Sequence, residues 1–258
     1  MDWTHYVIAV AGGALAGAIN TLAGNGSAIT LTILTEVLGL PGNLANGTNR
    51  LGVLAQSLAG SWAFHRNGKL NLQRSGLYIA LMVVGALAGV WAAVSVTHAQ
   101  FREVFRFLMV VMLFVILFKP ARWLRETDPH FRAGKWWTVP LFLAIGFYGG
   151  FIQMGMGILF LAAMVLGARF SLIEANAAKI FGVALYTLPV LLVFQYRHLV
   201  DWEVGAVMAG GQMFGGWFTA HHASKHPRAN VWAHRLLVLI VVLSILKLFG
   251  VFELLFKG

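Results

Sequence analysis

Polar and charged side chains recur at helical spacing inside two long apolar runs of the chain. The first series, at i, i+3, i+4, i+7 and i+11, consists of Asn46, Asn49, Arg50, Val53 and Ser57. The second series shares this type of spacing and consists of Asn176, Lys179, Val183 and Thr187. A cation and amide donors on one helix face predict a site for a small oxyanion or organic anion. The alternative is that Arg50 and Lys179 extend to the membrane interface, because both lie near a helix start.

Two glycine turns, Gly24-Asn25-Gly26 and Gly155-Met156-Gly157, each open a short apolar run, over 28–40 and 157–167. A helix of about 12 residues rises only about 18 Å, so one end must stop inside hydrocarbon that is about 30 Å thick. Free N–H groups at such a helix start favour an anion, although a tight packing turn without a ligand gives the same pattern.

Three further polar residues lie close to these breaks. Thr48 lies near the break Pro41-Gly42-Asn43, which ends the first short run. Asn20 and Gln153 precede the two glycine turns at matching places, where an interhelical hydrogen bond is the alternative to a role in the cavity. The predicted substrate-binding residues are Asn20, Gly24, Asn25, Gly26, Asn46, Thr48, Asn49, Arg50, Gln153, Gly155, Met156, Gly157, Asn176 and Lys179.

The sequence offers little for catalysis or for a bound metal. It has no cysteine, no P-loop and no Ser/His/Asp grouping, and His221, His222 and His226 fall in one loop that is expected to be solvated. We therefore expect no enzyme activity, no cofactor and no metal.

Composition places these residues in a membrane. Of the 258 residues 59% are apolar and only 11% are charged, whereas about 25% are charged in a soluble domain. The formal net charge of +10 resides in short loops between apolar runs, which favours contact with lipid headgroups over nucleic-acid binding. The chain is predicted to be an all-α polytopic membrane protein, with the lipid bilayer and a small anion as partners.

Ten apolar runs divide into two similar halves. Ala45-Asn46-Gly47 and Gly52 recur about 130 residues later as Ala175-Asn176-Ala177 and Gly182, and the glycine turns recur at about the same distance. This pattern predicts a duplication with repeat 1 over 1–118, a basic cytoplasmic linker over 119–137 and repeat 2 over 138–258. Each repeat holds four long transmembrane helices and one short half-helix, giving eight long and two short helices.

The orientation follows from charge. An odd number of segments per copy predicts that the second repeat is inverted, and an N-terminus outside places twelve Lys and Arg residues in cytoplasmic loops against four outside. Both termini are then outside a cytoplasmic (inner) membrane. Inverted repeats with broken helices are typical of secondary transporters whose site lies near the midplane. An anion channel and a membrane enzyme are the rival classes; a coupling ion (proton or sodium) and a homodimer are open possibilities.

The motifs resemble those of the sulfite exporter TauE/SafE family. They are GAINTLAGNG at 17–26, ANGTN at 45–49, GGFIQMGMG at 149–157 and ANAAK at 175–179. The resemblance covers essentially the whole chain and implies a permease for sulfur-containing anions such as sulfite, thiosulfate or an organosulfonate such as sulfoacetate, often moved outward. Asn25 and Met156 stand where the family's turns are often glycine, and Ala178-Lys179 replaces a Thr-containing motif, so the resemblance leaves the exact anion undecided.

Overall fold

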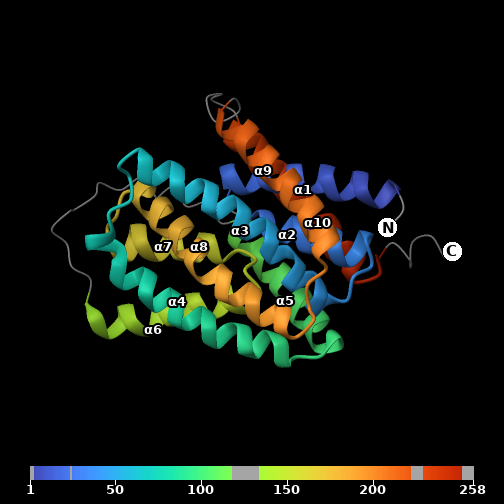
Figure 1. Cartoon of the computed structure of the whole chain (residues 1–258), viewed down its shortest axis with the longest axis horizontal. Coiled ribbons are helices and arrows are strands. Elements are labelled where there is room, and N and C mark those ends of the chain that lie inside the picture. The colour runs from blue at the N-terminus through green and yellow to red at the C-terminus, as the bar shows by residue number, and fades with distance from the viewer. Residues whose placement is uncertain (1–2, 24, 118–133, 222–228, 252–258) are drawn as a thin grey trace. The chain divides into compact units, whose positions relative to one another are not determined.

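The computed structural model describes residues 3–23, 25–117, 134–221 and 229–251, and these contain helices and no strand. The elements are α1 (Trp3–Ala23), α2 (Gly26–Thr32), η1 (Ile33–Val37), α3 (Gly42–Arg66), α4 (Leu72–Ser95), α5 (His98–Leu117), α6 (Lys135–Phe151), α7 (Met156–Ala162), η3 (Ala163–Gly167), α8 (Leu172–Tyr196), α9 (Trp202–His221) and α10 (Ala229–Leu248) (Figure 1). The all-helical prediction is confirmed, and in this part of the chain eight α-helices have at least 17 residues and two have seven. Of these helices, α4 and α8 are each long and apolar enough to cross a membrane by length and composition.

The helices begin and end close to the breaks seen in the sequence. In the sequence two of the apolar runs begin at Phe105 and at about residue 235, but the helices that contain them, α5 and α10, begin earlier, at His98 and Ala229. Polar residues in a first turn do not prevent a helix. The predicted linker 119–137 also overlaps α6, which begins at Lys135, and most of that linker lies outside the described residues.

Both short helices continue into a π-helical turn and end in the same way. In α2–η1 the N–H groups of Leu38 and Leu40 donate to Ile33 and Leu34, and Gly39 between them has a φ of 69°. In α7–η3 the corresponding bonds run from Ala168 and Phe170 to Ala163 and Met164, around Arg169 with a φ of 55°. A residue in the left-handed region lets the chain reverse and start the next long helix.

The chain forms two compact units that are each built from both halves of the sequence. Unit 1 comprises 1–52, 96–119 and 199–258, and unit 2 comprises 53–95 and 120–198. These units differ from the predicted repeats, 1–118 and 138–258. The units are defined by which helices pack together, whereas the repeats are defined by similarity between the two halves of the sequence. The repeat boundaries therefore stay a prediction.

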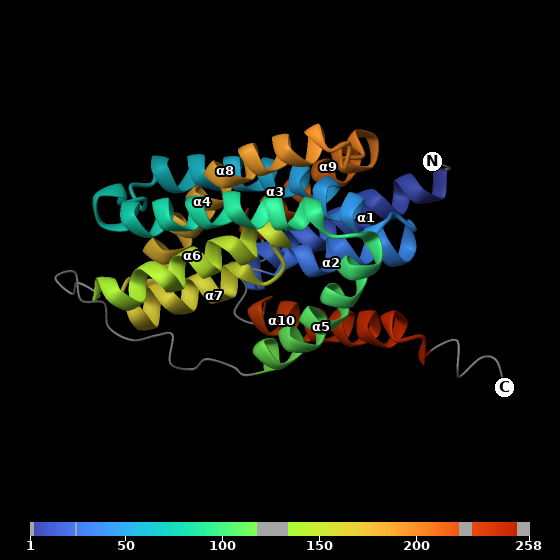
Figure 2. The same ribbon diagram turned by 90° about the horizontal axis from the view of Figure 1, so that it is seen from below.

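In unit 1, α1 packs closely along α9 (Figure 1), and the contact is made by glycines. Gly13 and Gly17 face the carbonyl groups of Met208 and Gln212, and reciprocally Gly211 and Gly215 face those of Val10 and Ala14. In the same unit α10 lies beside α5 (Figure 2). Without Cβ atoms, backbones approach closely enough for dispersion contacts along the whole helix pair.

Unit 2 contains the same kind of glycine-mediated helix contact, made by other helices. There α4 packs along α6, and Gly146 and Gly150 face the carbonyl groups of Met82 and Ala86. In return, Gly85 and Gly89 face the carbonyl groups of Leu143 and Phe147. Unit 2 therefore contains a helix pair with the same kind of close backbone contact as the pair in unit 1.

Candidate functional site

The part of the polar series on α3 that belongs to unit 1, over residues 46–50, is buried. Asn46 and Arg50 have no exposed surface, and Thr48 and Asn49 are 1% exposed. Arg50 is the largest fully buried side chain among the described residues, and its Nη2 donates to Asn46 Oδ1 at 3.2 Å, one turn earlier on the helix. The interfacial alternative is therefore wrong for Arg50, whose guanidinium is directed into the protein.

Two side-chain contacts join α1, α2 and α3 around this series. Asn20 Oδ1 accepts a hydrogen bond from the backbone N–H of Gly26 at 3.2 Å, at the start of α2. One turn later, the Thr30 hydroxyl donates to Asn49 Oδ1 at 2.5 Å. A side chain at Gly26 would collide with Asn20 and with the carbonyl of Ala16, so this position requires glycine. Of the predicted first turn, Gly24 lies outside the described residues.

Several buried amide groups in this unit have no hydrogen-bond partner among the described residues. They are both polar atoms of the Asn25 side chain, which is 1% exposed, and Nδ2 of Asn49. A buried polar group without a partner costs about 1–3 kcal/mol. Proteins retain such groups where a ligand, ion or water completes the bonding, so Asn25 and Asn49 indicate a binding site.

Gln212 is a member of this cluster that the sequence interpretation missed. It lies on α9, is 4% exposed, and its Nε2 lacks a partner within the described part of the chain. The absent Cβ of Gly52 on α3 makes room for its amide, and its backbone packs on Gly17 of α1. The sequence signal that could have identified it is a single amide within an otherwise apolar run.

Thr48 has a different role from its neighbours. Its hydroxyl accepts a hydrogen bond from the backbone N–H of Asp201 at 2.9 Å, and its methyl group lies near Gly205. The hydroxyl thus satisfies a backbone donor just before α9 begins. In the structure Thr48 anchors α9 to α3.

The second glycine turn belongs to unit 2 and is held by two tyrosines. Gln153 has a φ of 68° and Gly155 a φ of 72°. The Tyr186 hydroxyl donates to Gln153 Oε1 at 2.8 Å, and the Tyr148 hydroxyl donates to the carbonyl of Met154 at 2.6 Å. The interhelical hydrogen bond that was the alternative for Gln153 is present, and it braces a strained turn.

The other predicted site residues of unit 2 differ in how deeply they are buried, unlike those on α3 in unit 1. Lys179 is 9% exposed, and no hydrogen-bond or ion-pair partner of its ammonium group is found among the described residues. Asn176 and Gly157 are only half-buried, and Met156 is buried against Gly149. Lys179 is therefore the member of this set best placed to meet a ligand.

Glu174, one of the few carboxylates near these helices, is already engaged. It closes a capping box with Ser171 at the start of α8, and its Oε2 lies 3.5 Å from Arg74 Nη1. Among the described residues no group of three metal-ligating side chains occurs, and the His222 and His226 loop lies outside them. His221 ends α9, and its side chain is not described.

A helical protein that buries a cation and amide donors among membrane-length apolar helices belongs to the class of membrane transport proteins. Residues 9–248 match the model of the family described as Sulfite exporter TauE/SafE, and the chain belongs to this family. The family is one of transporters, so the expectation that the chain is not an enzyme is confirmed.

Curated relatives agree with this class. The chain is 30% identical over 211 residues to "Probable membrane transporter protein ORF9" of Sinorhizobium sp, covering 81% of this chain and 79% of that protein. It is 29% identical over 206 residues to a "Probable membrane transporter protein" of Haemophilus influenzae, covering 79% of each chain. It is 30% identical over 206 residues to YfcA of Escherichia coli K12, a "Probable membrane transporter protein", covering 78% and 74%. No solved structure matches the chain.

Proposed function

We propose that this protein is a permease for small sulfur-containing anions, namely sulfite, thiosulfate or an organosulfonate such as sulfoacetate, and that it exports them. The observation that carries the proposal is Arg50, fully buried beside Asn46 in a unit that also buries unpartnered amides of Asn25 and Asn49. A guanidinium and amide N–H groups match the negative charge and the oxygen acceptors of an oxyanion. The family description supplies the sulfur chemistry and the direction.

The low-dielectric surroundings strengthen this match. An anion that binds next to Arg50 is attracted more strongly in this buried, low-dielectric environment than it would be in water. Gln212 Nε2 adds a donor that none of its described neighbours uses. The result is selectivity for a solute with several acceptor oxygens over a neutral solute of the same size.

We further propose that transport proceeds by alternating access between two inverted repeats. The two short helices support a duplication, because their terminal hydrogen bonds, their π-helical turns and their left-handed residues correspond at a spacing of about 130 residues. The helix pairs support it too, since α1 with α9 and α6 with α4 carry equivalent reciprocal glycine contacts. The inverted orientation, the inner membrane and the outer position of both termini rest on the charge count.

Lys179 is proposed as a substrate-binding residue of unit 2, and the experiment is saturable uptake of radiolabelled sulfite and thiosulfate by proteoliposomes. Arg50→Gln and Lys179→Gln should each abolish saturable uptake, whereas the control Arg197→Gln should retain it, because Arg197 is exposed at the end of α8. All four proteins are first compared by thermal melting, so that a folding defect is recognised.

The outcomes separate the alternatives. If Arg50→Gln and Lys179→Gln both transport like the wild type, the proposed site is wrong. Flux that does not saturate with anion concentration would indicate a channel instead of a permease. Imposed proton and sodium gradients identify a coupling ion, and the mass of the purified protein tests the homodimer.

A further inference from the structure

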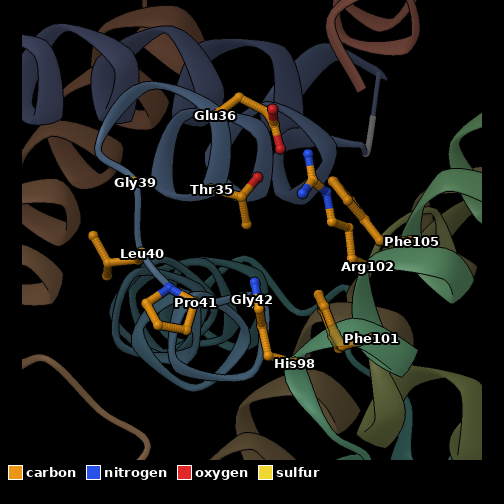
Figure 3. A pocket seen from close by; sticks show the side chains of 10 residues that line it. All are labelled: Thr35, Glu36, Gly39, Leu40, Pro41, Gly42, His98, Phe101, Arg102 and Phe105. Atoms are coloured by element: carbon orange, nitrogen blue, oxygen red, sulfur yellow. Dashed lines mark hydrogen bonds between the residues drawn. The ribbon is translucent and has the colours of Figure 1, made fainter. Parts of the chain in front are cut away.

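A cavity of ≈ 180 Å³ lies in unit 1, and Arg50 is not among the residues that line it. Its walls come from the end of η1, the loop that leads into α3 and the first turns of α5 (Figure 3). Gly42, at the start of α3 and on this wall, precedes Arg50 by eight residues, which is about 12 Å along a helix. The cavity is therefore distinct from the buried amide cluster.

Two opposite charges face one another across this cavity without meeting. The carboxylate of Glu36 points from η1 and the guanidinium of Arg102 points from α5, and the two groups are turned toward each other (Figure 3). No hydrogen bond or ion pair joins Glu36 to Arg102, and neither side chain has another such partner in the described ranges. A gap between opposite charges is the arrangement that a molecule with both a positive and a negative end would bridge.

The remaining walls suit such a molecule. His98 Nδ1 accepts a hydrogen bond from the backbone N–H of Gly42 at 2.8 Å, so in the neutral ring Nε2 carries the proton and remains a donor for an anion. Phe101 and Phe105 are 1% exposed and stack with ring centroids 6.1 Å apart, which provides an apolar wall. Thr35 donates its hydroxyl proton to the Leu31 carbonyl at 2.9 Å and keeps an oxygen lone pair free to accept.

Further contacts within the described part of the chain define the walls of this cavity but leave the charged groups of Glu36 and Arg102 unpaired. Gly42 has no side chain, and any Cβ there would collide with the Phe101 ring. Lys247 of α10 donates to the backbone carbonyl of Glu36 and leaves the Glu36 carboxylate unpaired. In contrast, Glu103 and Arg106 on α5 form an ion pair with each other at 2.7 Å.

We propose that this cavity binds a small zwitterion, with its ammonium group at Glu36 and its oxyanion at Arg102 and His98. The ligand class is that of short amino acids in which one to three carbons separate the two charges, because the cavity is small and the charges are close. This inference does not depend on the anion permease, since it uses none of the buried amide residues.

The experiment is titration calorimetry on the purified full-length protein with glycine, β-alanine and γ-aminobutyrate, each compared with propionate and propylamine. We expect one of the three zwitterions to bind at least tenfold more tightly than either singly charged probe. Glu36→Gln should reduce this affinity to that of propionate, and Arg102→Gln should reduce it to that of propylamine. The conservative variants Glu36→Asp and Arg102→Lys should retain part of it.

Two controls make the test specific. The double variant Glu103→Gln/Arg106→Gln removes charges from the same helix that are already paired, and it should bind like the wild type. Arg50→Gln, which lies in the anion site, should also leave zwitterion binding unchanged. The proposal is overturned if no zwitterion exceeds the singly charged probes, or if binding is lost in Arg50→Gln and kept in Arg102→Gln.

Discussion

Replacing Gly215 by alanine should force α9 away from α1 and destabilise the protein, whereas the same replacement at Gly210 should not. A Cβ at Gly215 would lie 2.6 Å from the carbonyl carbon of Ala14 and would overlap the carbonyl oxygen. A Cβ at Gly210, five residues earlier on the same helix, meets nothing within 4 Å. The two variants therefore compare the same added methyl group at a position packed against another helix and at a position with free space around it.

The magnitude follows from the two distances. Ordinary van der Waals contact begins at 3.4 Å, so the helix backbones must separate by about 0.8 Å or more at Gly215, and backbone cannot rotate aside as a side chain can. Overpacking of this kind costs about 1–3 kcal/mol. Alanine is a better helix former than glycine by about 0.8–1.0 kcal/mol, so Gly210→Ala should gain about that amount.

The measurement is reversible unfolding of each purified variant by denaturant in mixed micelles, with thermal melting as a second readout. We expect opposite signs, with Gly215→Ala less stable than the wild type and Gly210→Ala slightly more stable. Gly89 and Gly76 on α4 provide the same comparison in unit 2, since Gly89 faces the Phe147 carbonyl and Gly76 faces open space. Equal effects at Gly215 and Gly210 would refute the idea that close backbone contact maintains these helix pairs.

Three further predictions concern single side chains. Gln212→Leu should weaken anion binding about tenfold without lowering the melting temperature, because it removes an unpartnered buried donor; an unchanged affinity in an anion titration would exclude Gln212 from the site. Ser171→Ala removes the capping box of α8 and should cost about 1 kcal/mol in denaturant unfolding, with the exposed Ser95→Ala as the comparison. His198→Gly should raise stability by about 1 kcal/mol, because His198 has a φ of 56° and the equivalent position in the first half is Gly68; a loss of stability would mean that its side chain matters more than its backbone strain.

Most helices could be predicted from the sequence, because the residues that start or stop a helix act on backbone groups close to them in the chain. Pro41, the glycine turns and Ser171 stop or start a helix through backbone groups that lie within a few residues of them. The polar face of α3 was also predictable, since Asn46, Asn49 and Arg50 lie one turn apart. The sequence left open whether Arg50 is buried or extends to the membrane interface, and the structure decided for burial.

Contacts between distant segments could not be predicted in this way. A glycine stripe shows that a helix has a close neighbour, but the stripes of α1 and α9 carry no mark that pairs them. For the same reason the sequence did not single out Gln212, and it did not predict the hydrogen bond from the Asp201 N–H to Thr48. The facing charges of Glu36 and Arg102 belong to segments that are far apart in the chain.

The amino-acid sequence by itself determined the all-helical class, most of the helix limits, the family and the polar face of α3, because these depend on composition and on neighbours along the chain. The tertiary structure alone decided which backbones touch, which amides stay without partners and where the cavity between η1 and α5 opens, because such contacts join residues as distant as Gly52 and Gln212. The physical reason is that apolar side chains bury equally well against many surfaces, and only the complete packing of a unit selects one of them.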